Sequence, residues 1–281
     1  MKRLRSVLVG ILMLLALLAH IHAQAWIGSP GASNVYFDWT EPSKGSIWAL
    51  QRPTYTGTAA WPLRGFWLGA SKDISLGDGF GALISGSVFF PRRSAGTWRD
   101  EPLTRTFDFE IPSYDWWSID GLAKCSVAGD AEVLAGFRWD HTSTRVKYSD
   151  NTDDDYILNA YLPLIGMQLN KRFSDCSMLL RCVGSPWVGG RLKYHFWDNL
   201  GYAEFGDFRV NNGYFLEFFA DCSMRIAGAL SVGGFAKWNY LHIKSDEQSL
   251  SGSTTEPVSW AVDIRSWTFG ASLACAFASP F

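Results

Sequence analysis

Large apolar residues alternate with small, polar or charged residues through most of this chain, and this alternation restricts its fold more than any other feature. A period of two residues is the period of a β-strand, because successive side chains of a strand point to opposite faces. In the last such stretch the odd-numbered positions are apolar: Trp267, Phe269, Ala271, Leu273, Cys275 and Phe277. The even-numbered positions are small or polar, and helical periodicity is weak throughout. The sequence therefore predicts an all-β protein.

In other stretches the face opposite the apolar one is charged. One stretch places Val133, Ala135, Phe137 and Trp139 on one face, and Glu132, Arg138 and Asp140 on the other. Another sets Val188, Leu192, Tyr194 and Phe196 against Arg191, Lys193 and His195. A barrel wall with lipid outside and a polar lumen inside has this pattern. A soluble sandwich would turn the apolar face inward, so a second observation has to decide between the two.

The N-terminus supplies that observation, because it has the features of an export signal. Lys2, Arg3 and Arg5 precede an uncharged apolar run over residues 7–19, and Ala23-Gln24-Ala25 has the small-x-small pattern of a cleavage site. We expect residues 1–25 to be a signal peptide and residues 26–281 to be a β-barrel of a Gram-negative-type outer membrane. No segment reaches the roughly 18 apolar residues that a transmembrane helix needs. The first cysteine is Cys125, too distant for lipoprotein processing, so membrane attachment must come from the fold.

Composition narrows the classes of function. The 281 residues include 25 basic and 27 acidic side chains, which are interspersed, so no basic face is available for nucleic acid. The chain also has 14 Trp, 19 Phe and 10 Tyr, residue types that gather at the membrane interfaces of barrels. A Trp-rich carbohydrate-binding sandwich is the alternative explanation for these aromatic residues. The length fits one large domain.

A short motif recurs along the chain at intervals of about 50 residues. Asp175-Cys176-Ser177-Met178 and Asp221-Cys222-Ser223-Met224 are the best copies, and Lys124-Cys125-Ser126-Val127 precedes them. Each copy lies near a short turn, so the repeat predicts the hairpins of an up-and-down antiparallel β-barrel. Polar stretches at residues 90–114, 149–155, 199–212 and 245–257 are predicted to be extracellular loops. The hairpins give about ten strands with both termini in the periplasm, and the last residue, Phe281, is of a type that barrel-assembly machinery reads.

The sequence resembles the omptins, a family of ten-stranded outer-membrane proteases, over roughly residues 66–277. Three short segments carry the resemblance: Gly96-Thr97-Trp98-Arg99-Asp100-Glu101, Leu134-Ala135-Gly136-Phe137 and Ser185-Pro186-Trp187-Val188. The resemblance implies a tall, narrow barrel. It also implies a rim where an Asp pair faces an Asp-His pair and activates water against a peptide bond.

The matching positions lack those catalytic pairs. The Asp-x-Asp of the family would fall at residues 91–95, which read Pro-Arg-Arg-Ser-Ala. The Asp-x-His would follow Trp187-Val188, where the chain reads Tyr194-His195-Phe196-Trp197-Asp198. We therefore predict no catalytic residue. The expected function is a non-enzymatic outer-membrane barrel, structural or a narrow pore, with extracellular binding loops; an omptin-like protease with a displaced active site is the alternative.

The alternation assigns a set of ionisable side chains to the lumen: Asp120, Lys124, Glu132, Arg138, Asp140, Arg191, Lys193, His195, Glu217, Asp221 and Lys237. A barrel of about ten strands is narrow, so we expect most of these charges to pair and fill it. An open pore is the alternative.

The five cysteines lie near predicted periplasmic turns, in a compartment that permits disulfides. Cys125, Cys222 and Cys275 are expected to face lipid. Cys176 and Cys182 are expected to lie across one hairpin and are the only candidate disulfide. No metal site or cofactor is predicted, because no histidine is near the cysteines. The expected partners are outer-membrane lipid, lipopolysaccharide and the barrel-assembly machinery.

Overall fold

The computed structural model describes residues 23–30, 34–41, 55–101, 105–149, 152–198, 200–227, 230–251 and 257–275. Within these ranges lie the strands β1 (Ala23–Pro30), β2 (Asn34–Glu41), β3 (Tyr55–Pro62), β4 (Gly65–Gly77), β5 (Phe80–Pro91), β6 (Ser94–Glu101), β7 (Arg105–Ala128), β8 (Ala131–Tyr148), β9 (Asp153–Phe173), β10 (Cys176–Ser185), β11 (Gly189–Trp197), β12 (Ala203–Ala227), β13 (Leu230–Ser245) and β14 (Ser259–Cys275). The predicted all-β class is confirmed. Among the described residues, no helix is long and apolar enough to cross a membrane.

Most of the predicted signal peptide, residues 1–22, lies outside the described residues. Its last three residues, Ala23 to Ala25, form the start of β1 and pair with β14. Cleavage of this segment stays a prediction, as does the role of Phe281, which also lies outside the described residues.

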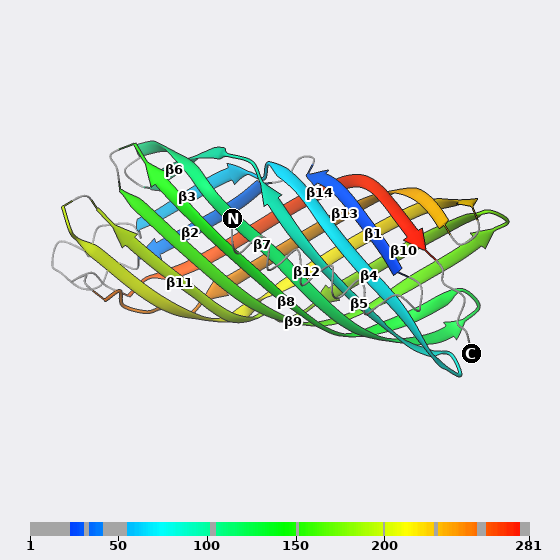
Figure 1. Ribbon diagram of the computed structural model, residues 1–281. Coiled ribbons are helices and arrows are strands. Elements are labelled where there is room, and N and C mark those ends of the chain that lie inside the picture. The colour runs from blue at the N-terminus through cyan, green and yellow to red at the C-terminus, as the bar shows by residue number, and fades with distance from the viewer. Residues whose placement is uncertain are drawn as a thin grey trace.

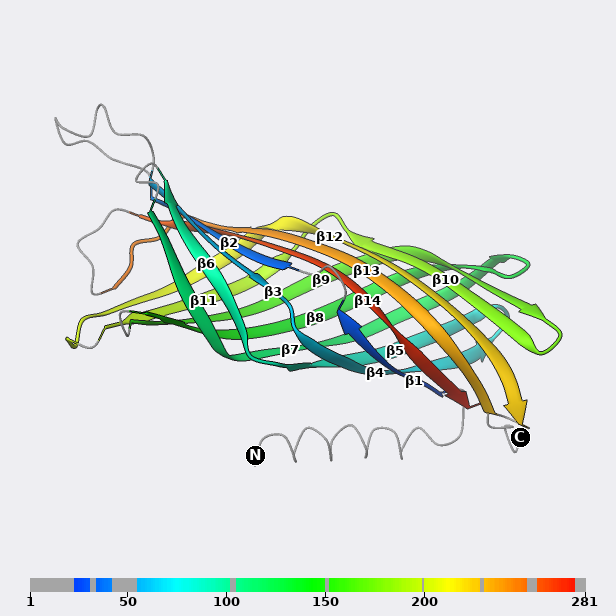
Figure 2. The ribbon, with the colours of Figure 1, turned by 90° about the horizontal axis from the view of Figure 1, so that it is seen from above.

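The strands close into one antiparallel barrel (Figure 1). At one end β1 pairs with both β4 and β14, and the ring runs β1-β4-β5-β7-β8-β9-β10-β12-β13-β14. At the other end β2, β3, β6 and β11 take the places of β1, β4, β5 and β10. Over the described residues each level therefore has ten strands, as predicted. Figure 2 shows the barrel as elongated, with strongly tilted strands.

A proline lies at every point where one wall strand is divided into two. Pro30 ends β1, Pro62 ends β3, Pro91 ends β5, and Pro186 follows β10. Proline has no backbone N–H to donate to the sheet, so the ladder is interrupted at these positions. Pro112 falls within a register shift of β7 for the same reason. The interruptions separate the two levels of the barrel.

The connections are short at one end of the barrel. The β4–β5 turn contains Asp78 at φ 50°, the β7–β8 turn contains Gly129 at φ 55°, and the β9–β10 turn contains Ser174 at φ 51°. Positive φ is the backbone state that tight hairpins require. In outer-membrane barrels short turns face the periplasm, which orients the molecule.

In the half of the barrel near the short turns, here called the lower part, the strands turn the faces outward and inward that the sequence predicts. On β14, Trp267, Phe269 and Leu273 are exposed on the outer wall, whereas Ser266, Thr268 and Ser272 are buried. On β8, Phe137 and the other odd-numbered apolar residues also point outward. The outer wall is therefore apolar and the inner wall is polar, as a lipid-spanning barrel requires.

A belt of aromatic rings marks the upper limit of this apolar wall. Trp139 packs on Trp117 with ring centroids 4.7 Å apart and on Tyr161 at 6.2 Å. Farther round the wall, Tyr214 packs on Tyr240 at 5.4 Å. Eight residues of β8 separate this belt from the periplasmic turn, which is about 20 Å along the axis of a tilted strand. The strands continue well above the belt, so the barrel extends beyond the lipid on the outer side.

The faces of β11 are the reverse of those predicted. Leu192 is buried and Tyr194 points inward, whereas Arg191 and Lys193 are exposed and His195 shares their outward face. The strand lies above the aromatic belt, where the outer wall meets water instead of lipid. Charged side chains are therefore stable on the outside there, and apolar ones fill the interior. The prediction that Arg191, Lys193 and His195 line the lumen was wrong.

Two of the predicted loops are largely strand. Residues 94–101 and 105–113 belong to β6 and β7, which pair from Ser94 opposite Ile111 to Asp100 opposite Arg105. Residues 203–212 begin β12, and β9 starts at Asp153 inside a third predicted loop. Polar residues in these segments predict loops, but above the lipid the outer face of a strand is itself polar.

The interior of the barrel as the candidate functional site

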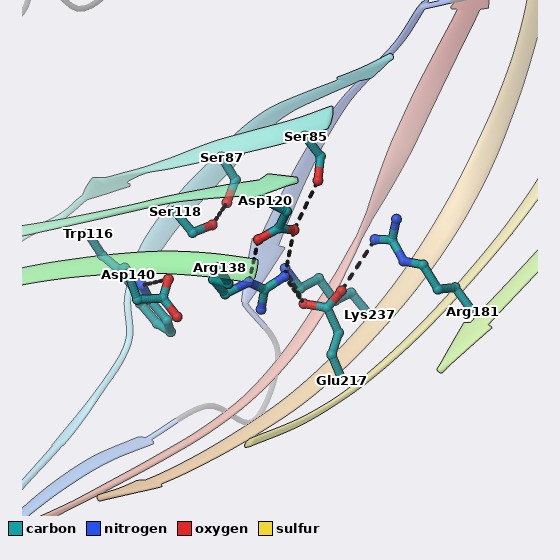
Figure 3. A network of polar contacts seen from close by, with 10 residues as sticks. All are labelled: Ser85, Ser87, Trp116, Ser118, Asp120, Arg138, Asp140, Arg181, Glu217 and Lys237. Carbon is teal, nitrogen blue, oxygen red and sulfur yellow. Dashed lines mark hydrogen bonds and ion pairs between the residues drawn. The ribbon is translucent and has the colours of Figure 1, made fainter. Parts of the chain in front are cut away.

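A cluster of charged side chains crosses the lumen within the lipid-spanning part of the barrel (Figure 3). Arg138 on β8 makes two bonds to Asp120 on β7, from Nε to Oδ1 at 2.5 Å and from Nη2 to Oδ2 at 2.8 Å. The same guanidinium reaches Glu217 on β12, with 2.9 Å between Nη2 and Oε2. Ser85 on β5 donates its hydroxyl to Asp120 Oδ2 at 2.9 Å. Such forked, charge-assisted bonds fix the planar guanidinium in one orientation.

Glu217 is the centre of the cluster, since three cations surround it. Besides Arg138, Arg181 on β10 lies 3.3 Å from Oε1, and Lys237 on β13 lies 3.1 Å from Oε2. Only 1% of Glu217 is exposed. A buried carboxylate is costly unless it is paired and hydrogen-bonded, and here the surrounding cations meet that requirement.

The buried cluster is formally neutral once Asp140 is included. Trp116 Nε1 donates to Asp140 Oδ1 at 3.3 Å, next to Arg138 (Figure 3). The three carboxylates are then matched by the three cations of the cluster. Neutrality matters because a net charge in this low-dielectric interior would have no solvent to stabilise it.

The cluster joins strands that are not neighbours in the sheet. Between β8 and β12 lie β9 and β10, so the Arg138–Glu217 pair spans the interior. Lys237 of β13 lies 5.9 Å from the ring of Trp67 on β4, with β14 and β1 between them. Trp67 in turn packs on Trp116 of β7, with centroids 4.6 Å apart. Side chains of strands that are not neighbours are thus in contact across this level of the interior.

A second charged group lies closer to the periplasmic turns. Lys124 on β7 pairs with Asp73 on β4 at 2.5 Å and with Glu132 on β8 at 3.2 Å. Gln168 on β9 donates to Glu132 Oε2 at 2.8 Å. This group connects side chains of β4, β7, β8 and β9 on the periplasmic side of the first cluster.

Above the lipid the interior is aromatic around one buried acid, Asp154. The hydroxyls of Tyr148 and Tyr156 each donate to Asp154 Oδ2 at 2.9 Å, and that of Tyr194 donates to Oδ1 at 3.2 Å. Trp260 of β14 packs on Tyr156 and Tyr194, with centroids 5.3 and 5.0 Å apart. Burial raises the pKa of Asp154 to about 7, although the three hydroxyls oppose this shift. The contact between β9 and β14 bridges the lumen at a second level.

The structure brings together eight of the side chains assigned to the lumen from the sequence. They lie inside the barrel: Asp120, Lys124, Glu132, Arg138, Asp140, Glu217, Asp221 and Lys237. The sequence reading missed Asp73, Arg181 and Asp154. The alternation of Arg181 with Leu180 and Cys182 predicts an inward-facing side chain, so the sequence contained a signal for it. Asp154 lies in a segment that the sequence predicts to be a solvated loop.

The three described histidines each have different neighbours. His141 Nδ1 lies 2.8 Å from Asn159, and His242 lies 3.2 Å from Asp263 on the outer wall. His195 stacks on Phe205 and lies opposite Asp155 across the β9–β11 ladder. Among the described side chains, no three His, Cys, Asp or Glu residues gather as a metal site would need.

Comparison with solved structures agrees with this architecture. Outer membrane protease OmpT from Escherichia coli matches with a TM-score of 0.69 at 10% identity, covering 92% of this chain and 97% of that one. The transport unit of the autotransporter AIDA-I from Escherichia coli matches with a TM-score of 0.39 at 9% identity, covering 92% and 91%. The outer membrane protein OprG from Pseudomonas aeruginosa matches with a TM-score of 0.34 at 10% identity, covering 92% and 96%. No protein-family model matches the sequence, and no curated protein matches it.

These findings define the class: the chain is an outer-membrane β-barrel protein. At 10% identity the likeness to OmpT concerns the fold and leaves the activity open.

Proposed function

We propose that this protein is a non-enzymatic outer-membrane barrel with a filled lumen, which presents its extracellular strands and hairpins as a binding surface. The observation that supports this proposal is the contact across the interior, at two levels, between strands that are not neighbours in the barrel. Arg138 and Glu217 join β8 to β12 within the lipid, and Tyr156 and Trp260 join β9 to β14 above it. A solute would have to break both layers to pass, and the lower layer contains buried ion pairs between Asp120, Arg138, Glu217, Arg181 and Lys237.

Single-channel recording on the refolded full-length protein in a planar bilayer tests the closed lumen. The wild type is expected to give no steady conductance. A variant with Tyr156→Ala and Trp260→Ala is expected to stay closed, because the charged layer remains. Adding Arg138→Ala and Glu217→Ala to that variant removes both layers, and conductance steps are then expected. Steady conductance of the wild type would refute the filled lumen and favour the narrow pore.

The rival function is a surface protease with a displaced active site. His195, Asp155 and Asp153 share the outer face of the extracellular rim, and on the same wall His242 pairs with Asp263, whose Oδ1 also accepts from the Tyr240 hydroxyl. However, Asp153 is engaged by Arg145 at 3.1 Å, and the ring of His195 stacks on Phe205 and Trp197. Incubation of the refolded protein with a peptide library is therefore expected to give no cleavage. Cleavage that disappears in Asp155→Asn would establish the rival.

We also propose that lipopolysaccharide is a partner on the outer wall. The reversed faces of β11 leave Arg191 and Lys193 exposed above the belt, as are Lys147 on β8 and Arg209 on β12. Phosphate groups of the outer leaflet are the natural counterions of such side chains. Charge reversal with Lys193→Glu and Lys147→Glu should weaken salt-sensitive binding to purified lipopolysaccharide. Unchanged binding would argue against this contact.

A further inference from the structure

The two best copies of the sequence repeat pair with each other in the sheet. Cys176 lies opposite Met224, Ser177 opposite Ser223, and Met178 opposite Cys222, across β10 and β12. Because the strands are antiparallel, the motif Cys-Ser-Met meets its own copy in reverse order. Each thiol therefore faces a thioether across the ladder.

The four sulfur atoms share one face of the wall. The hydroxyls of Ser177 and Ser223 bond to each other at 2.8 Å on the inner face, where Ser223 is buried. Since neighbouring residues of a strand point to opposite sides, the cysteines and methionines point outward. Cys176 and Cys222 are free thiols and are exposed.

The group lies at the periplasmic edge of the wall. Cys176 directly follows the Ser174–Asp175 turn, and Arg225 N donates to Asp175 O at 2.8 Å. Lys171 of β9 lies opposite Met178 in the ladder, and its Nζ lies 3.2 Å from Asp130 Oδ2. The position is reachable from the periplasm, unlike one at the middle of the bilayer.

The pairing also separates the two thiols. Cys176 and Cys222 occupy diagonal positions, for which Cα atoms are about 7–8 Å apart. Disulfides rarely bridge more than about 7 Å. Two thiols and two thioethers are thus held side by side without being placed for oxidation to a disulfide.

We propose that Cys176, Met178, Cys222 and Met224 form a binding site for a soft monovalent metal ion, Cu(I). Thiolate and thioether ligands select Cu(I) over harder cations. Binding replaces the proton of each coordinating thiol with the metal, and the copper stays in its reduced state.

The alternative is that these four residues only form part of the apolar outer wall and bind no ligand. Cys125 provides the matched control, because it starts a looser copy of the repeat but lies opposite Val133 and Phe80, with no sulfur across the ladder. If sulfur alone on the wall were enough, Cys125 would contribute as much as the other cysteines.

The test is anaerobic titration of the refolded full-length protein with Cu(I) against a chromophoric Cu(I) chelator. The wild type is expected to retain one equivalent, and so is Cys125→Ser. The double variant Cys176→Ser and Cys222→Ser is expected to lose it, whereas Met178→Leu with Met224→Leu is expected to weaken retention at least tenfold. Heat-modifiable mobility on gels verifies that each variant is folded.

In the titration and in peptide mapping, two results would overturn the site. One is a wild type that retains no Cu(I), or that loses it equally in Cys125→Ser. The other is a disulfide between Cys176 and Cys222, detected by non-reducing peptide mapping of protein from cells. X-ray absorption showing only sulfur neighbours around copper would support it, and nitrogen or oxygen neighbours would contradict it.

Discussion

At the scale of single residues, the barrel depends on how its buried charges are satisfied. Glu217 has three cations within ion-pair distance and almost no exposed surface. Asp154 accepts hydrogen bonds from three tyrosine hydroxyls. The first acid is stabilised in its charged form, and the second is pushed toward its neutral form.

Glu217→Ala should lower the free energy of unfolding by about 3–5 kcal/mol, because it leaves buried cations without their shared partner. Urea unfolding of the refolded protein in detergent micelles measures this loss. The control is Asp207→Asn, which breaks the exposed pair with Arg191 and should cost about 1 kcal/mol or less. Equal losses in both variants would contradict the central role of Glu217.

Asp154→Asn should change how stability depends on pH. Burial raises the pKa of Asp154 from 3.8 to about 7, so the folded state holds its proton more tightly than the unfolded state. Its contribution is fully present below about pH 4 and is lost as the pH rises through about 7. The Asn variant has no such titration, so its stability relative to wild type should increase between pH 4 and 8. A difference between the two proteins that is constant over this range would contradict the assignment.

At the scale of elements, the position of a strand relative to the lipid decides which face carries its charges. β8 and β14 turn apolar residues outward within the lipid, whereas β11 turns Arg191 and Lys193 outward above it. The divided strands show a second rule, since Pro62, Pro91 and Pro186 mark the points where the ladder is interrupted.

Phe137→Arg should block assembly of the barrel, and Leu273→Arg should lower the yield of folded barrel to a smaller extent. Both side chains lie on the outer wall, where an Arg costs about 2–4 kcal/mol near the middle of the bilayer and less toward its edges. Phe137 lies well inside the wall, whereas Leu273 pairs with Val232 near the periplasmic edge. The measurement is the fraction of heat-modifiable folded protein in lipid vesicles. Leu273→Phe is the control and should fold, while normal folding of the Arg variants would mean that the faces are inverted.

Gly136→Ala should be destabilising, whereas Gly121→Ala should be tolerated. A Cβ added at Gly136 would meet the carbonyl oxygen of Gly121 at 2.0 Å and the Cα of Leu122 at 2.8 Å, and both are backbone atoms that cannot move aside cheaply. A Cβ at Gly121 would meet no atom within 4 Å. Refolding yield in micelles compares them, and equal yields would show that β7 and β8 can separate locally.

At the scale of the whole molecule, the barrel has two levels with different surroundings. The lower level has a charged interior and an apolar wall, and the upper level has an aromatic interior and a polar wall. The short turns close the lower end, while long strand pairs project from the upper end (Figure 2).

This arrangement predicts which ends are accessible on intact cells. An epitope tag inserted between Leu200 and Gly201, in the turn before β12, should bind antibody without permeabilisation. The same tag inserted between Gly129 and Asp130 should bind only after the outer membrane is breached. The reverse result would invert the orientation of the barrel.

The sequence by itself determined the class of fold, the number of wall strands and the faces of the strands within the lipid. It did so because a period of two residues and the transfer cost of charge into lipid act locally, residue by residue, as in Val133 to Asp140. It could not determine that Glu217 collects three cations, since those come from strands up to 79 residues away in sequence.

Only the tertiary structure decided where the lipid ends along each strand. That limit reversed the faces of β11, turned the predicted loops around residues 94–113 into strand and buried Asp154. The tertiary structure also decided the positions of the cysteines. Cys176 and Cys182, which were expected to lie across a hairpin, lie on the same strand, β10, and Cys176 pairs with Met224 in the ladder. The physical reason is that register and depth in the membrane are properties of the closed sheet, in which each strand is fixed by both of its neighbours.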